Sequence, residues 1–140
     1  MKADFCLFKD LLKATEDDAL ETYVRHLGFD EKWKDDKTFD EVQAVAKERE
    51  RRILYHLSLL VDARMIDGVE VRKTLQGAYA YGFYAPTLTL KGNEFYSHIT
   101  NSRLLQSLRV LAEKSGSALT IGFVVRYAEG LLDKITQTIG

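Results

Sequence analysis

Two groups of basic side chains in the middle of the chain have the chemistry to hold phosphate. One group begins a predicted helix and the other lies in a predicted β-hairpin. With two neighbours they form the candidate DNA-binding set Arg49, Arg51, Arg52, Arg72, Lys73, Gln76 and Tyr79. Their cations bind phosphate oxygens, and residues at the start of a helix can reach base edges in the major groove. A solvated helix face, on which the arginines pair with Glu48 and Glu50, is the alternative.

The chain offers no comparable pattern for catalysis or metal binding. His26, His56 and His98 stand apart without the spacing of metal ligands, and the single cysteine, Cys6, lies on an apolar helix stripe. His56 has no nucleophile or carboxylate partner in the sequence, so we expect a partly buried, hydrogen-bonded structural residue. No phosphate-binding loop, dinucleotide-binding glycine pattern or nucleophile elbow is present. We therefore expect a protein that is not an enzyme and uses no cofactor.

A helix and a hairpin must position the two basic groups. Between Glu50 and Met65, apolar residues recur at steps of three and four, which predicts an amphipathic helix that Gly68 closes. Strand patterns follow at 69–75 and 83–90, joined by a glycine-containing loop at 76–82. Pro86 places the second strand at an edge or in a bulge. The order predicts a mainly α fold with a small β-hairpin (α+β), a winged helix-turn-helix with additional C-terminal helices.

Helices are also predicted on both sides of this block. Asp4 caps the first, Thr15 or Asp17 caps a second that runs to about residue 27, and a polar loop at 29–37 follows. A capping box at Thr38 and Glu41 begins a third helix. Its extent is open, because nothing breaks the helix between 39 and 63 although the winged-helix architecture favours two helices. Helices at 91–99, 103–114 (capped by Asn101 or Ser102) and 119–139 complete the chain.

Length and composition describe one folded domain. The 140 residues are 46% hydrophobic and 29% charged, as in ordinary globular proteins. A single cysteine fits a reducing compartment, and neither a membrane span nor a signal peptide is visible, so we expect a cytoplasmic protein without membrane contact. We divide the domain into N-terminal helices with an acidic insert (1–48), the candidate DNA-facing helix, wing and next helix (49–99), and C-terminal helices (100–140).

The charge distribution offers limited support for nucleic-acid binding. Residues 1–48 hold 8 basic and 13 acidic side chains, a balance of −5, whereas residues 49–98 hold 7 and 5, a balance of +2. A nucleic-acid-binding domain usually shows a clear basic face. The acidic N-terminal third would repel phosphate if it lay beside the contact surface.

The last helix carries more apolar surface than a single stripe requires. Phe123, Val124 and Val125 are consecutive, and a surface helix usually shows one apolar stripe. We expect a second copy of the chain to cover the excess, and burial beneath the N-terminal helix is the alternative. The predicted dimer interface consists of Phe123, Val125, Leu131, Leu132 and Ile135.

The segments YHLSLLVDARMIDG and LTLKGNEFYSHI resemble an uncharacterised bacterial and phage family, a domain of unknown function with a winged-helix core. That family pairs a YHL-x-LL-x-x-AGLI helix with a downstream LTxxGHEFLD segment, and the resemblance covers residues 1–12 and 50–139. More broadly, the block is similar to winged-helix regulators of the PadR and MarR types. Arg64 replaces the glycine of AGLI, and Asn93 replaces the histidine of GHEF. The resemblance implies a recognition helix at 49–63 and a wing tip at 73–82.

These observations predict a transcription regulator of bacterial or phage origin that binds duplex DNA as a homodimer. The alternative is a non-enzymatic protein-interaction module that keeps the winged-helix core without binding DNA. Such a module would use its acidic N-terminal third and an aromatic wing to bind a host or phage protein. The wing aromatics are Tyr79, Tyr81, Phe83 and Tyr84.

Overall fold

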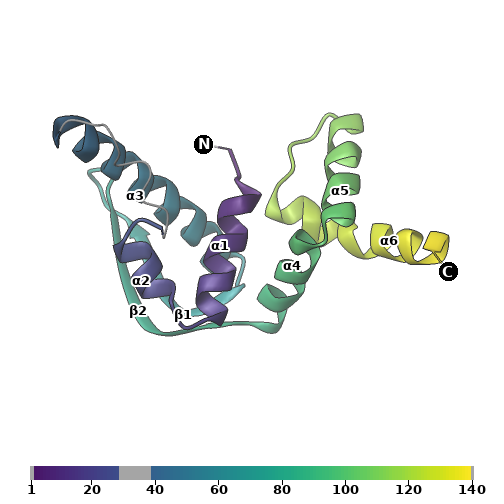
Figure 1. The fold of residues 1–140 in the computed structure, drawn as a ribbon, viewed down its shortest axis with the longest axis horizontal. Coiled ribbons are helices and arrows are strands. Elements are labelled where there is room, and N and C mark those ends of the chain that lie inside the picture. Colours follow the sequence, from purple (N-terminus) through teal and green to yellow (C-terminus); the bar gives the residue numbers. More distant parts are fainter. Residues whose placement is uncertain (1, 29–38, 140) are drawn as a thin grey trace.

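The computed structural model describes residues 2–28 and 39–139, which form six helices and one antiparallel hairpin (Figure 1). The elements are α1 (Phe5–Glu16), α2 (Leu20–Arg25), α3 (Phe39–Asp62), β1 (Ile66–Lys73), β2 (Tyr79–Leu88), α4 (Leu90–Thr100), α5 (Ser102–Lys114) and α6 (Ile121–Ile139). This mainly helical fold, with a small hairpin and helices after it, confirms the predicted α+β class. The helices α1 to α3 precede the hairpin in the order expected of a winged helix.

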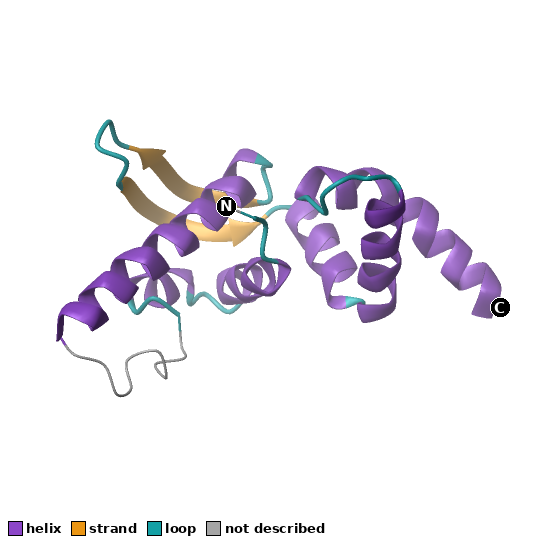
Figure 2. Ribbon diagram, turned by 90° about the horizontal axis from the view of Figure 1, so that it is seen from above, coloured by secondary structure: helices purple, strands orange, loops and turns teal. Residues whose placement is uncertain are grey.

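The elements form two groups along the length of the molecule (Figure 2). The first group contains α1, α2, α3 and the hairpin, and the second contains α4, α5 and α6. Helix α1 connects them, because it packs against α3 in its own group and α4 in the other. None of the helices in the described residues has the length and apolar character that a membrane crossing requires.

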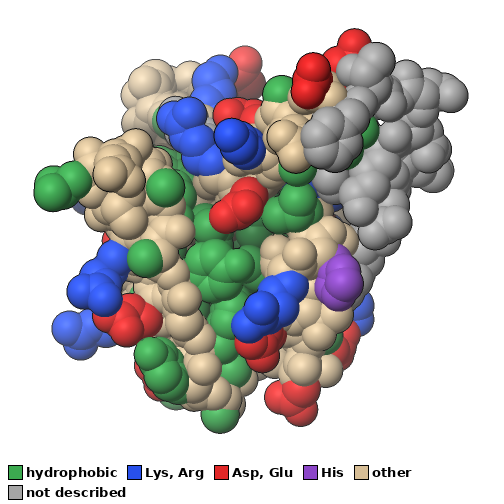
Figure 3. All heavy atoms as spheres, turned by 90° about the vertical axis from the view of Figure 1, so that its left-hand side faces the viewer, with side chains coloured by type: hydrophobic (Ala, Val, Ile, Leu, Met, Phe, Trp, Pro, Cys, Tyr) green, Lys and Arg blue, Asp and Glu red, His purple; other side chains and the backbone are tan. Residues whose placement is uncertain are grey.

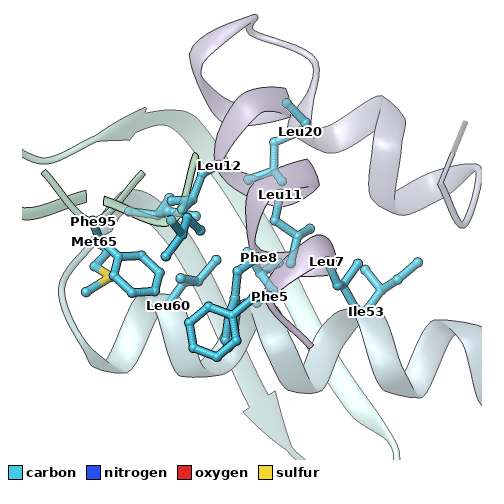
Figure 4. Packing of buried hydrophobic residues seen from close by; sticks show 14 of the residues in the cluster. Phe5, Leu7, Phe8, Leu11, Leu12, Leu20, Ile53, Leu60, Met65 and Phe95 are labelled. Carbon is cyan, nitrogen blue, oxygen red and sulfur yellow. The ribbon is translucent and has the colours of Figure 1, made fainter. Parts of the chain in front are cut away.

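Aromatic rings of α1 form the centre of the hydrophobic core. Figure 4 shows Phe5 and Phe8 pointing towards the end of α3 and towards Phe95 of α4. The ring centroids of Phe5 and Phe8 are 5.3 Å apart in an edge-to-face arrangement, and those of Phe8 and Phe95 are 6.1 Å apart. Phe95 and Ile99 of α4 are almost fully buried.

Two of the predicted helix caps are present. The Oδ1 atom of Asp4 accepts hydrogen bonds from the backbone N–H groups of Cys6 (3.0 Å) and Leu7 (3.2 Å) at the start of α1. At the start of α5, Asn101 Oδ1 accepts from the N–H of Leu104 at 3.1 Å. Both caps satisfy backbone donors that have no partner within the helix.

The prediction of a side-chain cap for α2 was wrong. Ala19 occupies the N-cap position and makes no such hydrogen bond. Thr15 is still part of α1, where its buried hydroxyl donates to the Leu11 carbonyl at 2.8 Å, and Asp17 follows the end of that helix. The connection is too tight for either residue to cap the next helix.

Residues 39–62 form one continuous helix rather than the two that the winged-helix architecture favoured. The local sequence decides the outcome, because residues 44–52 contain neither glycine nor proline and consist mainly of good helix formers. Val42, Val45 and Ala46 are half-buried, so the N-terminal half of α3 also has apolar contacts. The predicted loop at 29–37 and the capping residue Thr38 lie outside the described residues.

Helix α3 ends at Asp62, and Arg64 rather than Gly68 is the left-handed residue that closes it. The Arg64 N–H donates to the Val61 carbonyl and the Met65 N–H donates to the Leu60 carbonyl, both at 2.9 Å, which is the hydrogen-bond pattern of a Schellman motif. This motif requires a left-handed residue, and Arg64 has a φ of 62°. Gly68 lies in β1 instead. An arginine therefore occupies the conformation for which glycine is best suited.

Replacing Arg64 with glycine is expected to stabilise the protein. The exposed Arg64 side chain makes no hydrogen bond or ion pair among the described contacts, whereas its left-handed backbone costs an L-residue about 1 kcal/mol. We expect Arg64→Gly to raise the free energy of unfolding by about 1 kcal/mol in urea titrations. Gly116 occupies the matching position after α5, with a φ of 67°, so Gly116→Ala should have the opposite sign. A less stable Arg64→Gly protein would contradict this assignment.

The hairpin confirms the predicted irregularity at Pro86. The strands pair antiparallel from Ile66 opposite Leu88 out to Lys73 opposite Tyr79, with a register shift between Asp67 and Val69. The additional residues of β2 at this shift include Pro86, which lacks a backbone donor. The turn is shorter than predicted, since residues 79–82 belong to β2 rather than to the loop.

A tight turn holds the tip of the hairpin. The Thr74 N–H donates to the Ala78 carbonyl at 2.7 Å, and the Gly77 N–H donates to the Thr74 carbonyl at 3.0 Å. Gly77 has a φ of 84°, which suits a glycine that ends such a turn. Leu75 and Gln76 form the apex, and both are exposed.

Candidate nucleic-acid interface

The three arginines at the centre of α3 have different surroundings. The side chain of Arg51 is 60% exposed, and its nearest carboxylate is Glu48, with an N–O distance of 3.9 Å. An ion pair of this kind in water contributes little free energy. Arg51 can therefore exchange Glu48 for a phosphate at small cost.

Arg49 is half-buried and connects α3 to the end of α2. Its Nε–H donates to the carbonyl oxygen of Leu27, and its guanidinium lies against Gly28. A β-carbon on Gly28 would be 2.7 Å from Nη2 of Arg49, so the glycine leaves room for the guanidinium. The structure places Arg49 in a contact within the chain, apart from the exposed Arg51.

Beside Arg49, a polar cluster that the sequence did not reveal joins the first three helices. Burial raises the pKa of Tyr23 to about 12, and the nearby charge of Asp10 adds to this rise. Burial also raises the pKa of Asp10, which is hydrogen-bonded to Tyr23. The phenol of Tyr23 therefore keeps its proton and donates a hydrogen bond to the Asp10 carboxylate. Residues from α1, α2 and α3 form this cluster, so only the folded chain brings them together.

Arg52 binds the residue that caps α1. Its Nη2 forms an ion pair with Oδ2 of Asp4, while Oδ1 of the same carboxylate caps the helix. Partial burial raises the pKa of Asp4, but hydrogen bonds from Arg52, Leu7 and Cys6 outweigh this effect and hold the pKa below its usual value. A phosphate that bound Arg52 would have to compete with Asp4.

His56 completes the connection between α1 and α3, and it is fully buried. Its Nε2 accepts the backbone N–H of Asp4 at 2.9 Å, so Nδ1 must carry the proton and donate to the Arg52 carbonyl at 2.8 Å. Burial lowers the pKa of His56, and the positive charge of Arg52 acts in the same direction. The expected hydrogen bonding of His56 is confirmed, and its burial is complete rather than partial.

The wing carries the other predicted contacts near its tip. Arg72, Lys73 and Gln76 are exposed, and Arg72 Nε lies 3.3 Å from Glu70 Oε1. Tyr79 is half-buried and packs against the hydrophobic core. Leu75, which the sequence analysis did not single out, is fully exposed at the apex. Its position in a tight turn becomes apparent only from the turn geometry.

The wing aromatics do not form one exposed patch. Phe83 packs against the core together with Tyr79, and its ring centroid is 5.6 Å from that of Tyr81. Tyr81 is 37% exposed and Tyr84 is 67% exposed. The core therefore accounts for two of the four rings, and two remain accessible.

Charges of both signs surround the end of the molecule that carries the wing and the start of α3. Figure 3 shows hydrophobic side chains in the middle of this face, with basic and acidic side chains around them. On α3, the exposed cations Lys47 and Arg51 alternate with Glu48 and Glu50. This arrangement allows a few separate phosphate contacts rather than a continuous basic track.

The predicted dimer residues lie on different sides of α6. Val124 is fully buried, whereas Val125 is 45% exposed on one side of it and Phe123 is half-buried on the other. The ring centroids of Phe123 and Tyr127 are 4.6 Å apart. Leu131, Leu132 and Ile135 are half-buried in the part of α6 that extends away from α4 and α5 (Figure 2). Val125 is therefore the most exposed of the five predicted interface residues, and the other four are half-buried.

Comparison with known proteins found no match, whether among protein-family models, curated proteins or solved structures.

Proposed function

We propose that the protein binds duplex DNA through the N-terminal half of α3 and the tip of the hairpin. The observation that carries this proposal is that both segments extend from the hydrophobic core at the same end of the molecule (Figures 1 and 2). No residue within 40–52 or 67–80 is fully buried. A projecting helix beside a two-stranded ribbon suits a major groove and the neighbouring backbone.

Four exposed cations are the phosphate contacts in this proposal. Lys47 and Arg51 belong to the helix, and Arg72 and Lys73 belong to the ribbon. Arg49 and Arg52 have structural roles here, because they hold α2 and Asp4 against α3. Gln76, which is exposed at the tip three residues after Lys73, supplies a further hydrogen-bonding group.

A homodimer formed through α6 belongs to the same proposal. A second copy would cover the half-buried Leu131, Leu132 and Ile135 on the extending part of the helix. Two copies related by a two-fold axis would present two α3 helices to the duplex, as in dimeric DNA-binding proteins that recognise paired half-sites.

The double variant Arg51→Ala with Lys73→Ala tests the contact surface. Each phosphate contact contributes about −0.9 to the slope of log K against log salt, so the slope should become shallower by about 2 for each chain bound. Fluorescence anisotropy with a labelled duplex measures the slope, and light scattering of the complex should show two chains for each duplex. Both side chains are exposed, so folding should be unaffected.

The matched control removes two cations from α5, which lies in the other group of helices. Arg109→Ala with Lys114→Ala makes the same change in net charge but should leave the slope unchanged. Equal effects of the two double variants would mean that the total charge, and not this surface, governs binding. No effect of Arg51→Ala with Lys73→Ala would favour the alternative of a protein-interaction module, for which the exposed Leu75, Tyr81 and Tyr84 offer an apolar contact.

A further inference from the structure

A large apolar groove lies between the two groups of helices, away from the proposed DNA surface. Its volume is about 850 Å³. Tyr55 and Leu59 of α3 line it together with Ala63, which follows that helix; Ile121 and Val125 of α6 and Phe8 of α1 also contribute. The residues of α3 recur at steps of four, as do those of α6, so each helix presents one stripe to the groove.

The described contacts leave this groove open. Leu59 and Ile121 are half-buried and Val125 is 45% exposed, although all three belong to otherwise well-packed helices. A volume of this size lies within the range of small-molecule sites, which are mostly apolar with a few polar groups that fix the orientation of the ligand.

The charges that line the groove select the kind of ligand. Lys2 and Lys91 are the two basic residues that line the groove, and Asp62 is the single acidic one among the lining residues. An apolar body would fill the space between α3 and α6, while an anionic head could reach the lysines. A neutral apolar compound would make no ionic contact with the two lysines, and a cationic compound would be repelled by them.

We propose that this groove binds a small amphipathic carboxylate, with its apolar part between Leu59 and Val125 and its carboxylate at Lys2 and Lys91. The ligand would contact α3 directly through Tyr55 and Leu59. It would also bridge the two groups of helices, so binding stabilises their arrangement through mass action. This site is independent of the proposed DNA contacts.

Decanoate, decanol and decyltrimethylammonium, each kept below its critical micelle concentration, separate the apolar and charged parts of recognition. With the full chain, calorimetry should show saturable binding of one decanoate per molecule. Decanol should bind about tenfold more weakly, because it lacks the charge-assisted contact, and the cation should bind more weakly still. Equal affinities for the three compounds, or no saturable binding of decanoate, would overturn the proposal.

Two kinds of variant locate the binding. Lys2→Glu with Lys91→Glu should weaken the binding of decanoate at least about tenfold and leave the affinity for decanol unchanged, since only the contact with the head group is lost. Val125→Glu should weaken both compounds, and the 45% exposure of Val125 lets the variant fold. Circular dichroism checks the fold of each variant. Normal decanoate binding by Val125→Glu would overturn the proposal.

A second copy of the chain is the competing occupant, and light scattering distinguishes it. The proposal predicts that Val125→Glu loses decanoate binding without a change in the mass of the protein. If Val125→Glu instead halved that mass while the wild type failed to bind decanoate, the groove would be an interface between copies and the proposal would be wrong.

Discussion

Gly92→Ala is expected to lower the free energy of unfolding by about 3 kcal/mol or more, although alanine normally stabilises a helix relative to glycine. A β-carbon on Gly92 would be 2.0 Å from the carbonyl oxygen of Met65. That carbonyl cannot easily move, because it accepts the Thr89 N–H at 3.1 Å and the Met65 N–H is bonded to the Leu60 carbonyl. The glycine therefore allows the start of α4 to touch the end of α3.

Urea unfolding followed by circular dichroism measures this effect, with Gly130→Ala as the matched control. Gly130 lies within α6, and a β-carbon there would meet nothing within 4 Å. Alanine at that position should stabilise the protein by up to about 1 kcal/mol through helix propensity alone. If Gly92→Ala also raised the urea concentration at the midpoint of unfolding, the close approach of α4 to Met65 would not exist in solution.

His56→Phe is expected to lower the free energy of unfolding by about 2 kcal/mol at neutral pH. Phenylalanine nearly preserves the ring packing against Phe8, whose centroid lies 5.1 Å from that of the imidazole, but it leaves the Asp4 N–H without an acceptor. An unsatisfied buried donor costs an amount of this order. His26→Phe, at an exposed position, is the control and should change stability by less than about 0.5 kcal/mol.

The same histidine predicts how stability depends on pH. Because burial lowers the pKa of His56 below 6.5, the unfolded chain binds a proton at this residue before the folded chain does. The contribution of His56 to the free energy of unfolding is therefore complete above about pH 6.5 and decreases as the pH falls below that value. The difference in stability between wild type and His56→Phe should therefore narrow between about pH 6.5 and pH 5. A difference that widened on acidification would contradict the buried neutral imidazole.

Local chemistry in the sequence predicted much of the fold. The caps at Asp4 and Asn101, the irregular strand at Pro86 and the break after α5 each depend on residues close together in the chain. Their side chains bond to backbone groups a few residues away, or restrict their own backbone, so spacing alone is informative.

Features that depend on distant contacts could not be predicted in this way. Arg52 and Asp4 are separated by 48 residues, so their pairing is invisible until α1 packs on α3. For the same reason, the sequence grouped Arg49 and Arg52 with Arg51, although only Arg51 lacks a structural contact with another helix. The sequence predicted a helix over residues 91–99, but the proximity of Gly92 to Met65 depends on the fold.

Architecture was a less reliable guide than local propensity at α3. The expectation of two helices came from the winged-helix layout, whereas the residues themselves contain no breaker. At the end of this helix, by contrast, local propensity gave the wrong prediction. Propensity rules favoured Gly68 over Arg64, yet the Schellman hydrogen bonds place Arg64 in the left-handed position because Met65 and Ile66 must turn into the core.

The measurement that tests DNA binding most directly is the affinity of the wild-type chain for a duplex across a series of salt concentrations. Four exposed cations, Lys47, Arg51, Arg72 and Lys73, predict a slope of log K against log salt between about −2 and −4 for each chain bound. No detectable binding at the lowest salt concentration, or a slope near zero, would contradict the proposal that this surface binds duplex DNA.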